Sequence, residues 1–250
     1  MNARSMQGQV ALVTGGGGGI GSAICQRLAA AGAKVIITYR KSVEQAEAVA
    51  AQLPGSDHLV AQASVTDSAA LAGLAEQVAG RYGRLDLLVN NAGITTPVPH
   101  EDLDALSDGW IDRIFQTNWR GAFASVRAFK ALLQADDGGT IVNLSSIAGV
   151  TGVGSNVAYC ASKAALDSMT RSLARALAPK IRVVSVSPGW VLGEYAKKMD
   201  PAYIRQQEEM TPLKRLASPE DVAETVWAVA TKLTFMTGNI VPVDGGRPLL

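Results

Sequence analysis

Seven short apolar runs, rich in β-branched residues, alternate along the chain with alanine-rich stretches of helical periodicity. Strands that are apolar along most of their length indicate a parallel sheet, because crossover helices cover both of its faces. The alternation therefore predicts an α/β fold with a doubly wound parallel sheet of about seven strands, flanked by helices on both faces. The predicted strands are Gln9–Thr14, Lys34–Tyr39, His58–Ala63, Leu85–Asn90, Thr140–Ser145, Ile181–Val186 and Asn239–Val243.

Five consecutive glycines follow the first predicted strand. Ordering glycine costs more backbone entropy than ordering any other residue, so the run needs a physical reason. At the carboxyl ends of parallel strands, glycines permit a tight turn, keep side chains away from a pyrophosphate and let the next helix point its N–H groups at that anion. A strand before the run and a helix ending at Gly32 after it favour a Rossmann-like dinucleotide site over a flexible loop. Two registers fit the run: Gly16, Gly18 and Gly21 as G-x-G-x-x-G, or Thr14, Gly15, Gly19 and Gly21 as T-G-x-x-x-G-x-G.

The end of the second predicted strand bears on the choice of cofactor. An NAD site usually presents an acidic residue to the adenosine ribose there, whereas an arginine suits a 2′-phosphate. The strand ends in Tyr39, Arg40 and Lys41, with no acidic residue. We therefore expect NADPH or NADP⁺ to be preferred, with NADH or NAD⁺ as the alternative. The other interpretation of the two cations is a solvated start of the next helix.

Tyr159 and Lys163 lie four residues apart in VAYCASKAAL and share one face of a predicted helix. A free phenol has a pKa of about 10, too high for ready proton exchange near neutrality. A neighbouring ammonium group stabilises the phenolate and lowers that pKa. The spacing therefore predicts a proton donor for a hydride acceptor.

Composition excludes several classes of protein. With 250 residues, 48% apolar and 18% charged, the chain is typical of a compact protein, and we expect one catalytic domain over residues 1–250. The net charge of +1 gives no reason to expect nucleic acid as a partner. No apolar run reaches the roughly 18 residues of a membrane span, and the opening MNARSMQGQV does not resemble a secretory signal. We therefore expect no membrane partner and a cytoplasmic location.

No metal site is expected. Cys25 and Cys160 fall in helix-like patterns and are interpreted as small buried apolar residues rather than a disulfide or a metal pair. His58 and His100 stand alone, without the spacing of zinc ligands.

Several motifs occur in order along essentially the whole chain: TGGGGGIG (14–21), NNAG (90–93), Asn118 in QTNWRGAF, Ser146 in VNLSSIAG, YCASK (159–163), SPG (187–189) and TGNIVPVDGG (237–246). In combination they resemble the short-chain dehydrogenase/reductase family. The resemblance is strongest to the branch with 3-oxoacyl-carrier-protein reductases and small carbonyl or sugar-alcohol dehydrogenases.

The resemblance implies catalytic roles by position. Tyr159 would be the general acid in reduction and the base in oxidation, and Lys163 would lower its pKa and hold the nicotinamide ribose. Ser146 would hydrogen-bond the substrate oxygen, with its neighbour Ser145 as the competing candidate. Asn118 would hold a water that links the lysine to solvent.

The resemblance also implies a cofactor site, with two departures. Asn90 would contact the adenosine side, and Asn91 would brace the central strands. Ser64 stands where many relatives carry an acid that pairs with adenine, so that contact would be weaker or come from Val65. Gly193 stands where relatives often have threonine, so the next segment would close differently over the cofactor. The expected cofactor-binding residues are Gly15, Gly18, Gly19, Ile20, Gly21, Tyr39, Arg40, Ser64, Val65, Asn91, Ala92, Gly93, Tyr159, Lys163, Pro188, Gly189 and Val191.

These residues predict an NADPH-dependent reductase that converts a ketone or 3-oxoacyl carbonyl to a secondary alcohol. Two alternatives stay open: a dehydrogenase that oxidises an alcohol, sugar or steroid with NAD(P)⁺, and a sensor of the redox cofactor without catalysis. Substrate choice would depend on Ile94–Leu103 and on the loop-rich Gly189–Leu216, which carries Tyr195, Lys197 and Lys198 and would cover the site. A homotetramer, or a homodimer, would pair through the helices of residues 111–133 and 157–178 and through the last strand.

Overall fold

The structure, a computed structural model, describes residues 6–193, 196 and 199–249. Its centre is one seven-stranded parallel sheet in the order β3-β2-β1-β4-β5-β6-β7. The sheet confirms all seven predicted strands, with ends that shift by a few residues. They are β1 (Val10–Val13), β2 (Lys34–Tyr39), β3 (Leu59–Gln62), β4 (Leu87–Asn90), β5 (Gly139–Leu144), β6 (Ile181–Pro188) and β7 (Ile240–Val243).

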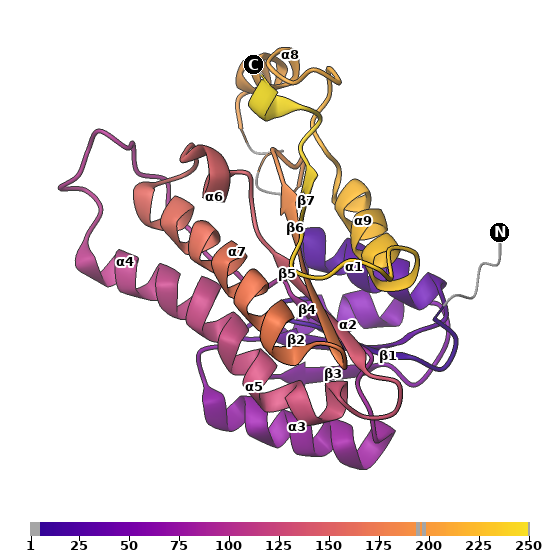
Figure 1. Cartoon of the computed structure of the whole chain (residues 1–250). Coiled ribbons are helices and arrows are strands. Elements are labelled where there is room, and N and C mark those ends of the chain that lie inside the picture. Colours follow the sequence, from indigo (N-terminus) through magenta and orange to yellow (C-terminus); the bar gives the residue numbers. More distant parts are fainter. Residues whose placement is uncertain (1–5, 194–195, 197–198, 250) are drawn as a thin grey trace.

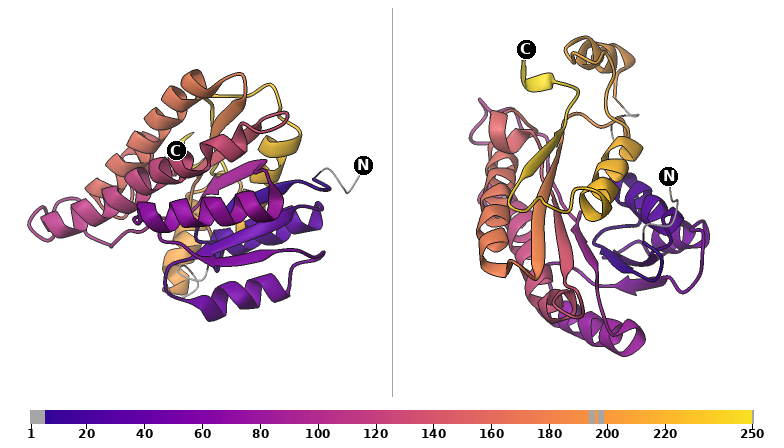
Figure 2. Two further views of the ribbon diagram at one scale, coloured as in Figure 1. Left: turned by 90° about the horizontal axis from the view of Figure 1, so that it is seen from below. Right: turned by 45° about the vertical axis from the view of Figure 1, so that its right-hand side comes forward.

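Helices cover both faces of the sheet (Figures 1 and 2), as the alternation predicts. The helices are α1 (Gly19–Ala30), α2 (Val43–Ala51), α3 (Ser68–Tyr82), α4 (Asp108–Phe115), α5 (Gly121–Leu133), α6 (Ala148–Thr151), α7 (Val157–Leu177), α8 (Pro201–Glu209) and α9 (Pro219–Thr231), with a π-helical turn η1 (Gln116–Arg120) and a 3-10 turn η3 (Arg247–Leu249). The predicted first helix ends at Ala30, two residues before Gly32, which has a φ of 99°.

Side-chain alternation along the strands builds two cores. Val13 and Ile37 pack with α1, α2 and α9 on one face, whereas Leu12 and Ile36 pack with α3 and α5 on the other. All four strand residues are fully buried. The sheet is therefore apolar on both sides, which accounts for the nearly continuous apolar runs in the sequence.

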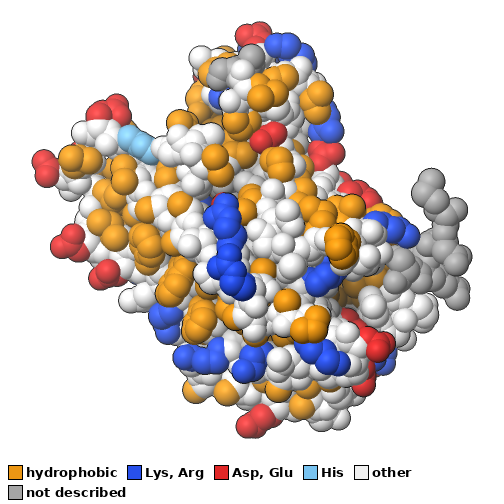
Figure 3. Space-filling model, viewed as in Figure 1, with side chains coloured by type: hydrophobic (Ala, Val, Ile, Leu, Met, Phe, Trp, Pro, Cys, Tyr) orange, Lys and Arg blue, Asp and Glu red, His pale blue; other side chains and the backbone are white. Residues whose placement is uncertain are grey.

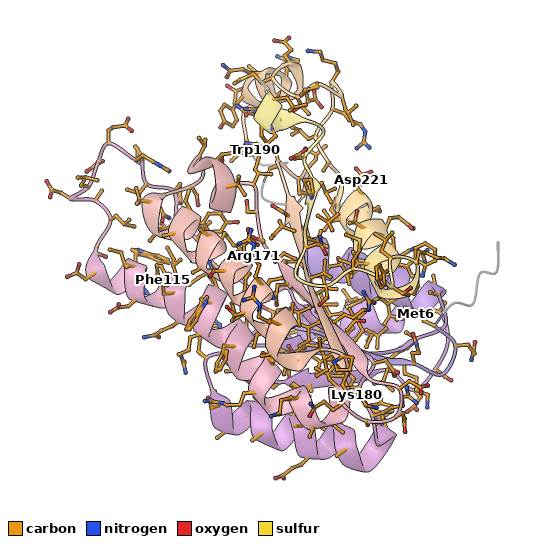
Figure 4. All side chains as sticks on the ribbon, in the orientation of Figure 1. Met6, Phe115, Arg171, Lys180, Trp190 and Asp221 are labelled. Atoms are coloured by element: carbon orange, nitrogen blue, oxygen red, sulfur yellow. The ribbon has the colours of Figure 1, made fainter. Side chains whose placement is uncertain are left out.

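All strands point their carboxyl ends to the same edge. In Figure 4, Lys180 and Trp190 mark the two ends of β6 and show that this edge lies at the top of the view. Strand order reverses between β1 and β4, which pair side by side although β2 and β3 lie between them in the chain. Ligands of doubly wound sheets bind outside the carboxyl ends at such a reversal.

Both signs of charge are spread over the face in Figure 3, in keeping with the net charge of +1. Among the described helices, none is long and apolar enough to cross a membrane. The described residues also contain no cluster of three or more His, Cys, Asp or Glu that could hold a metal ion. Both cysteines are free and buried.

Candidate active site

A cleft of about 330 Å³ opens at the carboxyl edge, beside the reversal of strand order. The segments that follow β1, β2, β3 and β4 form its walls. Nine of the expected cofactor-binding residues line it: Gly15, Gly18, Tyr39, Arg40, Ser64, Val65, Asn91, Ala92 and Gly93.

The glycine run turns from β1 into α1 in the second of the two predicted registers. Gly15 and Gly19 have φ values of 65° and 54°, in the left-handed region that favours glycine. A Cβ on Gly21 would lie 2.5 Å from the Gly15 carbonyl oxygen, so only glycine lets α1 pack this close to the turn. No side chain caps the start of α1, so its first N–H groups stay available to an anion.

Thr38 and Asn91 hold this turn from two sides. The Gly15 N–H donates to Thr38 Oγ1 at 3.3 Å, and the Gly16 N–H donates to the Thr38 carbonyl at 3.2 Å. Asn91 Nδ2 donates to the carbonyls of Thr14 and Gly15 at 2.9 and 3.1 Å. The turn is therefore fixed by the ends of β2 and β4.

The expected role of Asn90 is wrong, whereas Asn91 braces the central strands as expected. Asn90 points into the sheet and is 4% exposed, and its Nδ2 donates to Asn143 Oδ1 across β4 and β5 at 2.8 Å. Asn91, one residue later, lines the cleft. Successive residues of a strand face opposite ways, so Asn90 joins β4 to β5 inside the sheet, while Asn91 faces the site and ties the end of β4 to the end of β1.

The far end of the cleft carries the residues expected to choose the cofactor. Arg40 is exposed and lines the cleft, and its guanidinium has no ion-pair partner among the described residues. Ser64 Oγ lies 2.9 Å from Thr66 Oγ1 and accepts from the Thr66 N–H at 3.3 Å. Val65 lines the cleft beside them. This end thus presents one free cation and no carboxylate.

Tyr159 and Lys163 lie together on α7, as their spacing predicts. Asn156 caps this helix, with its Oδ1 accepting from the Tyr159 N–H at 2.7 Å. Lys163 is 6% exposed, and its Nζ lies 5.6 Å from the centre of the Tyr159 ring. The same Nζ donates to the Leu144 carbonyl at 2.7 Å. Burial lowers the pKa of Lys163 to about 8, although the nearby charge of Asp167 raises it.

The expected lowering of the Tyr159 pKa is wrong for the chain without ligands. Burial raises the pKa of the phenol above its ordinary value, and the nearby Ser146 hydroxyl opposes this increase. Loss of hydration disfavours the phenolate more than the hydroxyl stabilises it. Tyr159 is therefore protonated at neutral pH.

Ser146 and Ser145 differ in where they point. Ser145 is 5% exposed, and its Oγ donates to the Lys163 carbonyl at 3.4 Å, away from the phenol. Ser146 is half-buried, accepts from the Ala148 N–H at 3.2 Å and lies near the Tyr159 hydroxyl. The geometry favours Ser146, as the spacing does.

Asn118 lies in the π-helical turn η1 between α4 and α5. Its Oδ1 accepts from the Ile94 N–H at 2.8 Å, and its Nδ2 donates to the Ile94 carbonyl and to Ser162 Oγ. A Cβ on Gly93 would lie 3.4 Å from Asn118 Oδ1 and 3.8 Å from Lys163 Nζ. Asn118 thus ties the segment after β4 to α7 beside the lysine. The water expected at Asn118 stays a prediction.

Some expected residues lie elsewhere, and others were missed. Gly19, Ile20 and Gly21 shape the glycine turn. Tyr159 and Lys163 on α7, Pro188 at the end of β6, and Gly189 and Val191 after it do not line the cleft. The expectations for Tyr195, Lys197 and Lys198 fall outside the described residues. Sequence reasoning missed cleft-lining residues that immediately flank expected ones: Thr38, Ala63, Thr66 and Ile94 near the strand ends, and Thr117 beside Asn118 in η1.

Comparisons with known proteins agree with this geometry. A family model described as "Enoyl-(Acyl carrier protein) reductase" matches residues 15–247. The chain is 39% identical over 246 residues to "Granaticin polyketide synthase putative ketoacyl reductase 2" of Streptomyces violaceoruber, covering 96% of each chain. It is 34% identical over 240 residues to the 3-oxoacyl-[acyl-carrier-protein] reductase FabG of Staphylococcus aureus, covering 94% of this chain and 96% of that one.

A solved structure of similar fold comes from Brucella melitensis. It is described as "Short-chain dehydrogenase/reductase SDR:Glucose/ribitol dehydrogenase". The two chains superpose with a TM-score of 0.91 and 32% identity over 99% of each.

Proposed function

Because the chain belongs to the short-chain dehydrogenase/reductase family, a family of oxidoreductases, we propose that it reduces a ketone or 3-oxoacyl carbonyl to a secondary alcohol with NADPH. One observation carries the proposal: Tyr159 lies with Lys163 and Ser146, and this group adjoins the cleft through Gly93, where a Cβ would lie 3.8 Å from Lys163 Nζ. The names of the Streptomyces and Staphylococcus relatives, a ketoacyl reductase and a 3-oxoacyl reductase, support the same chemistry.

The cleft fits a dinucleotide. The uncapped start of α1 offers N–H donors to a diphosphate, and Gly18 has no atom within 4 Å of where a Cβ would project. Arg40 offers its free guanidinium to a 2′-phosphate. Asn91, Ala92 and Gly93 would line the nicotinamide half of the site. When bound, the reduced cofactor supplies the hydride.

The protein side of the reaction is positioning and proton transfer. Ser146 donates a hydrogen bond to the substrate oxygen and holds it beside the Tyr159 hydroxyl. Tyr159, protonated at neutral pH, gives its proton to that oxygen as the hydride arrives. Lys163 stabilises the phenolate that remains and holds the cofactor ribose.

The oxidative direction is the alternative, supported by the dehydrogenase name of the Brucella structure. A cofactor sensor without catalysis has no use for the Tyr159 proton donor. A panel of ketones with NADPH and a panel of secondary alcohols with NAD⁺ and NADP⁺ tests the proposal. Faster turnover of ketones supports reduction, and faster turnover of alcohols favours the alternative. Cofactor binding without turnover of any substrate would favour the non-catalytic sensor.

Cofactor preference has its own test. Arg40→Asp removes the cation and adds a carboxylate, so the preference for NADPH over NADH, measured as a ratio of kcat/KM values, should fall by at least about tenfold. Lys41→Asp is the matched control, since Lys41 is exposed and does not line the cleft. An unchanged ratio in Arg40→Asp refutes the NADPH assignment.

We also propose a homotetramer, or a homodimer, in the cytoplasm. Trp119 and Phe123 stack with ring centres 6.1 Å apart and are 36% and 38% exposed, on one of the expected pairing helices. Phe235, before β7, is fully exposed. Large exposed aromatic side chains are enriched at protein interfaces. Light scattering after size exclusion should give a multiple of the 26.0 kDa chain.

A further inference from the structure

A second ionisable side chain lies on the buried face of α7, one turn after Lys163. Asp167 is 3% exposed, and its position four residues on puts it on the same side of the helix as the lysine. Neither of its carboxyl oxygens has a hydrogen-bond partner among the described residues. A buried carboxyl group without partners is expensive and needs an explanation.

The nearest hydroxyls do not supply the missing partners. Ser145, after β5, and Ser185, on β6, are close enough to Asp167 to lower its pKa. Both are engaged elsewhere, since Ser145 Oγ donates to the Lys163 carbonyl at 3.4 Å and Ser185 Oγ lies 2.8 Å from Thr170 Oγ1. Both hydroxyls therefore help to stabilise the carboxylate, but neither makes a hydrogen bond to it with good geometry.

Two cations act on Asp167 within the described part of the chain, and both lie on α7. Arg171 is exposed on the outer side of the helix, where Figure 3 shows Lys and Arg side chains at the surface and Figure 4 labels it. Lys163 is buried like Asp167, so water screens their mutual interaction much less. The strands packed against this face contribute only the uncharged Ser145 and Ser185.

The two buried groups act on each other in opposite senses. Burial raises the pKa of Asp167, whereas the Ser145 and Ser185 hydroxyls lower it most and Arg171 and Lys163 lower it further. Burial lowers the pKa of Lys163 to about 8, and Asp167 is the charge that raises it. No direct ion pair joins them in the described structure, so the coupling acts through space.

We propose that Asp167 is the counter-charge that keeps Lys163 in its ammonium form, and so acts as a positioning residue for proton transfer at Tyr159. It touches neither substrate nor cofactor and works through Lys163 alone. The role in turnover rests on the proposed function, whereas the charge coupling does not. Ser145, the weaker candidate for the hydrogen bond to the substrate oxygen, lies beside this carboxyl group.

The proposal predicts a change in pH dependence. Asp167→Asn keeps the shape and removes the charge, so Lys163 should lose its proton about one pH unit lower. The alkaline fall of kcat for ketone reduction should then move from near the Lys163 pKa of about 8 to about pH 7. At pH 8 the rate should drop about fivefold, whereas at pH 6, where Lys163 stays charged, it should change less than about twofold. The cofactor KM at pH 6 should not change.

A second readout needs no turnover. The ¹³Cε resonance of Lys163, assigned by its loss in Lys163→Met, follows the charge of the lysine directly during a pH titration. Its midpoint should fall by about one pH unit in Asp167→Asn. Asp167→Glu, which keeps the charge, should retain the original midpoint. Glu76→Gln, an exposed carboxylate-to-amide change on α3, is the matched control and should move neither readout.

The outcomes separate the proposals. An unmoved Lys163 resonance midpoint in folded Asp167→Asn overturns the role of Asp167. If that variant does not fold, Asp167→Ser removes the charge with a smaller side chain and is judged by the same titration. Should wild-type protein turn over no ketone or alcohol, the proposed function fails, and the resonance titration still decides the coupling.

Discussion

Replacing Lys163 with methionine separates the cost of burying an ammonium group from the benefit of its chemistry. The pKa of Lys163 falls from 10.5 to about 8 on folding, a difference that corresponds to about 3 kcal/mol of destabilisation while the lysine is charged in both states. Below pH 8 that cost is fully present. Between pH 8 and pH 10.5 the unfolded chain binds the proton that the folded chain has released, so stability rises with pH.

Methionine has a similar length and no charge, so it removes this pH dependence. It also removes the hydrogen bond from Nζ to the Leu144 carbonyl, which costs about 1–3 kcal/mol at every pH. The net change at pH 7 is therefore small. The diagnostic quantity is its pH dependence: relative to wild type, Lys163→Met should lose about 2 kcal/mol of unfolding free energy between pH 7 and pH 9.5.

Urea unfolding of the ligand-free protein, at fixed protomer concentration and at pH 7, 8 and 9.5, measures this difference. Lys41→Met, at an exposed position, is the control and should differ from wild type by the same amount at each pH. A constant difference between Lys163→Met and wild type across this range would refute the assignment of a buried lysine that titrates near pH 8.

Two further substitutions test the fold around the cleft. Gly21→Ala puts a Cβ 2.5 Å from the Gly15 carbonyl oxygen, so it should lower the unfolding free energy in urea by about 1–3 kcal/mol and weaken cofactor binding. Gly18→Ala places its Cβ with no atom within 4 Å, so it should weaken cofactor binding without loss of stability. Equal unfolding free energies of the two variants would contradict the packing. Asp67→Ala removes the side chain that accepts from two N–H groups at the start of α3, and should lower unfolding free energy by about 1 kcal/mol with kcat unchanged; a loss of kcat instead would place Asp67 in the site.

The fold could be predicted from the sequence because its strongest signal is local. Each strand is short and apolar, and each following stretch has helical periodicity, so element type and parallel topology follow without knowledge of contacts. The glycine run predicted a dinucleotide turn but left its register open. The register depends on how closely α1 approaches Gly15, a distance that no local pattern encodes.

The sequence predicted the site residues that belong to a recognisable motif. It predicted less well the side-chain directions and pKa values that depend on burial. Asn90 does not face the cleft, because at the end of β4 its side chain points into the sheet and pairs with Asn143, whereas Asn91 beside it lines the cleft. The expected low pKa of Tyr159 considered only the neighbouring lysine, whereas burial of the phenol has the larger effect. Asp167 carried no recognisable motif, and only its burial without hydrogen-bond partners singles it out.

The proton donor is the central claim, and Tyr159→Phe tests it most directly. The substitution removes one oxygen and keeps the ring, so the dissociation constant of NADPH, measured by fluorescence titration, should stay within about twofold, while kcat for a ketone that wild type reduces should fall by at least about 100-fold. Turnover close to that of wild type, with the cofactor bound as tightly, would contradict the account.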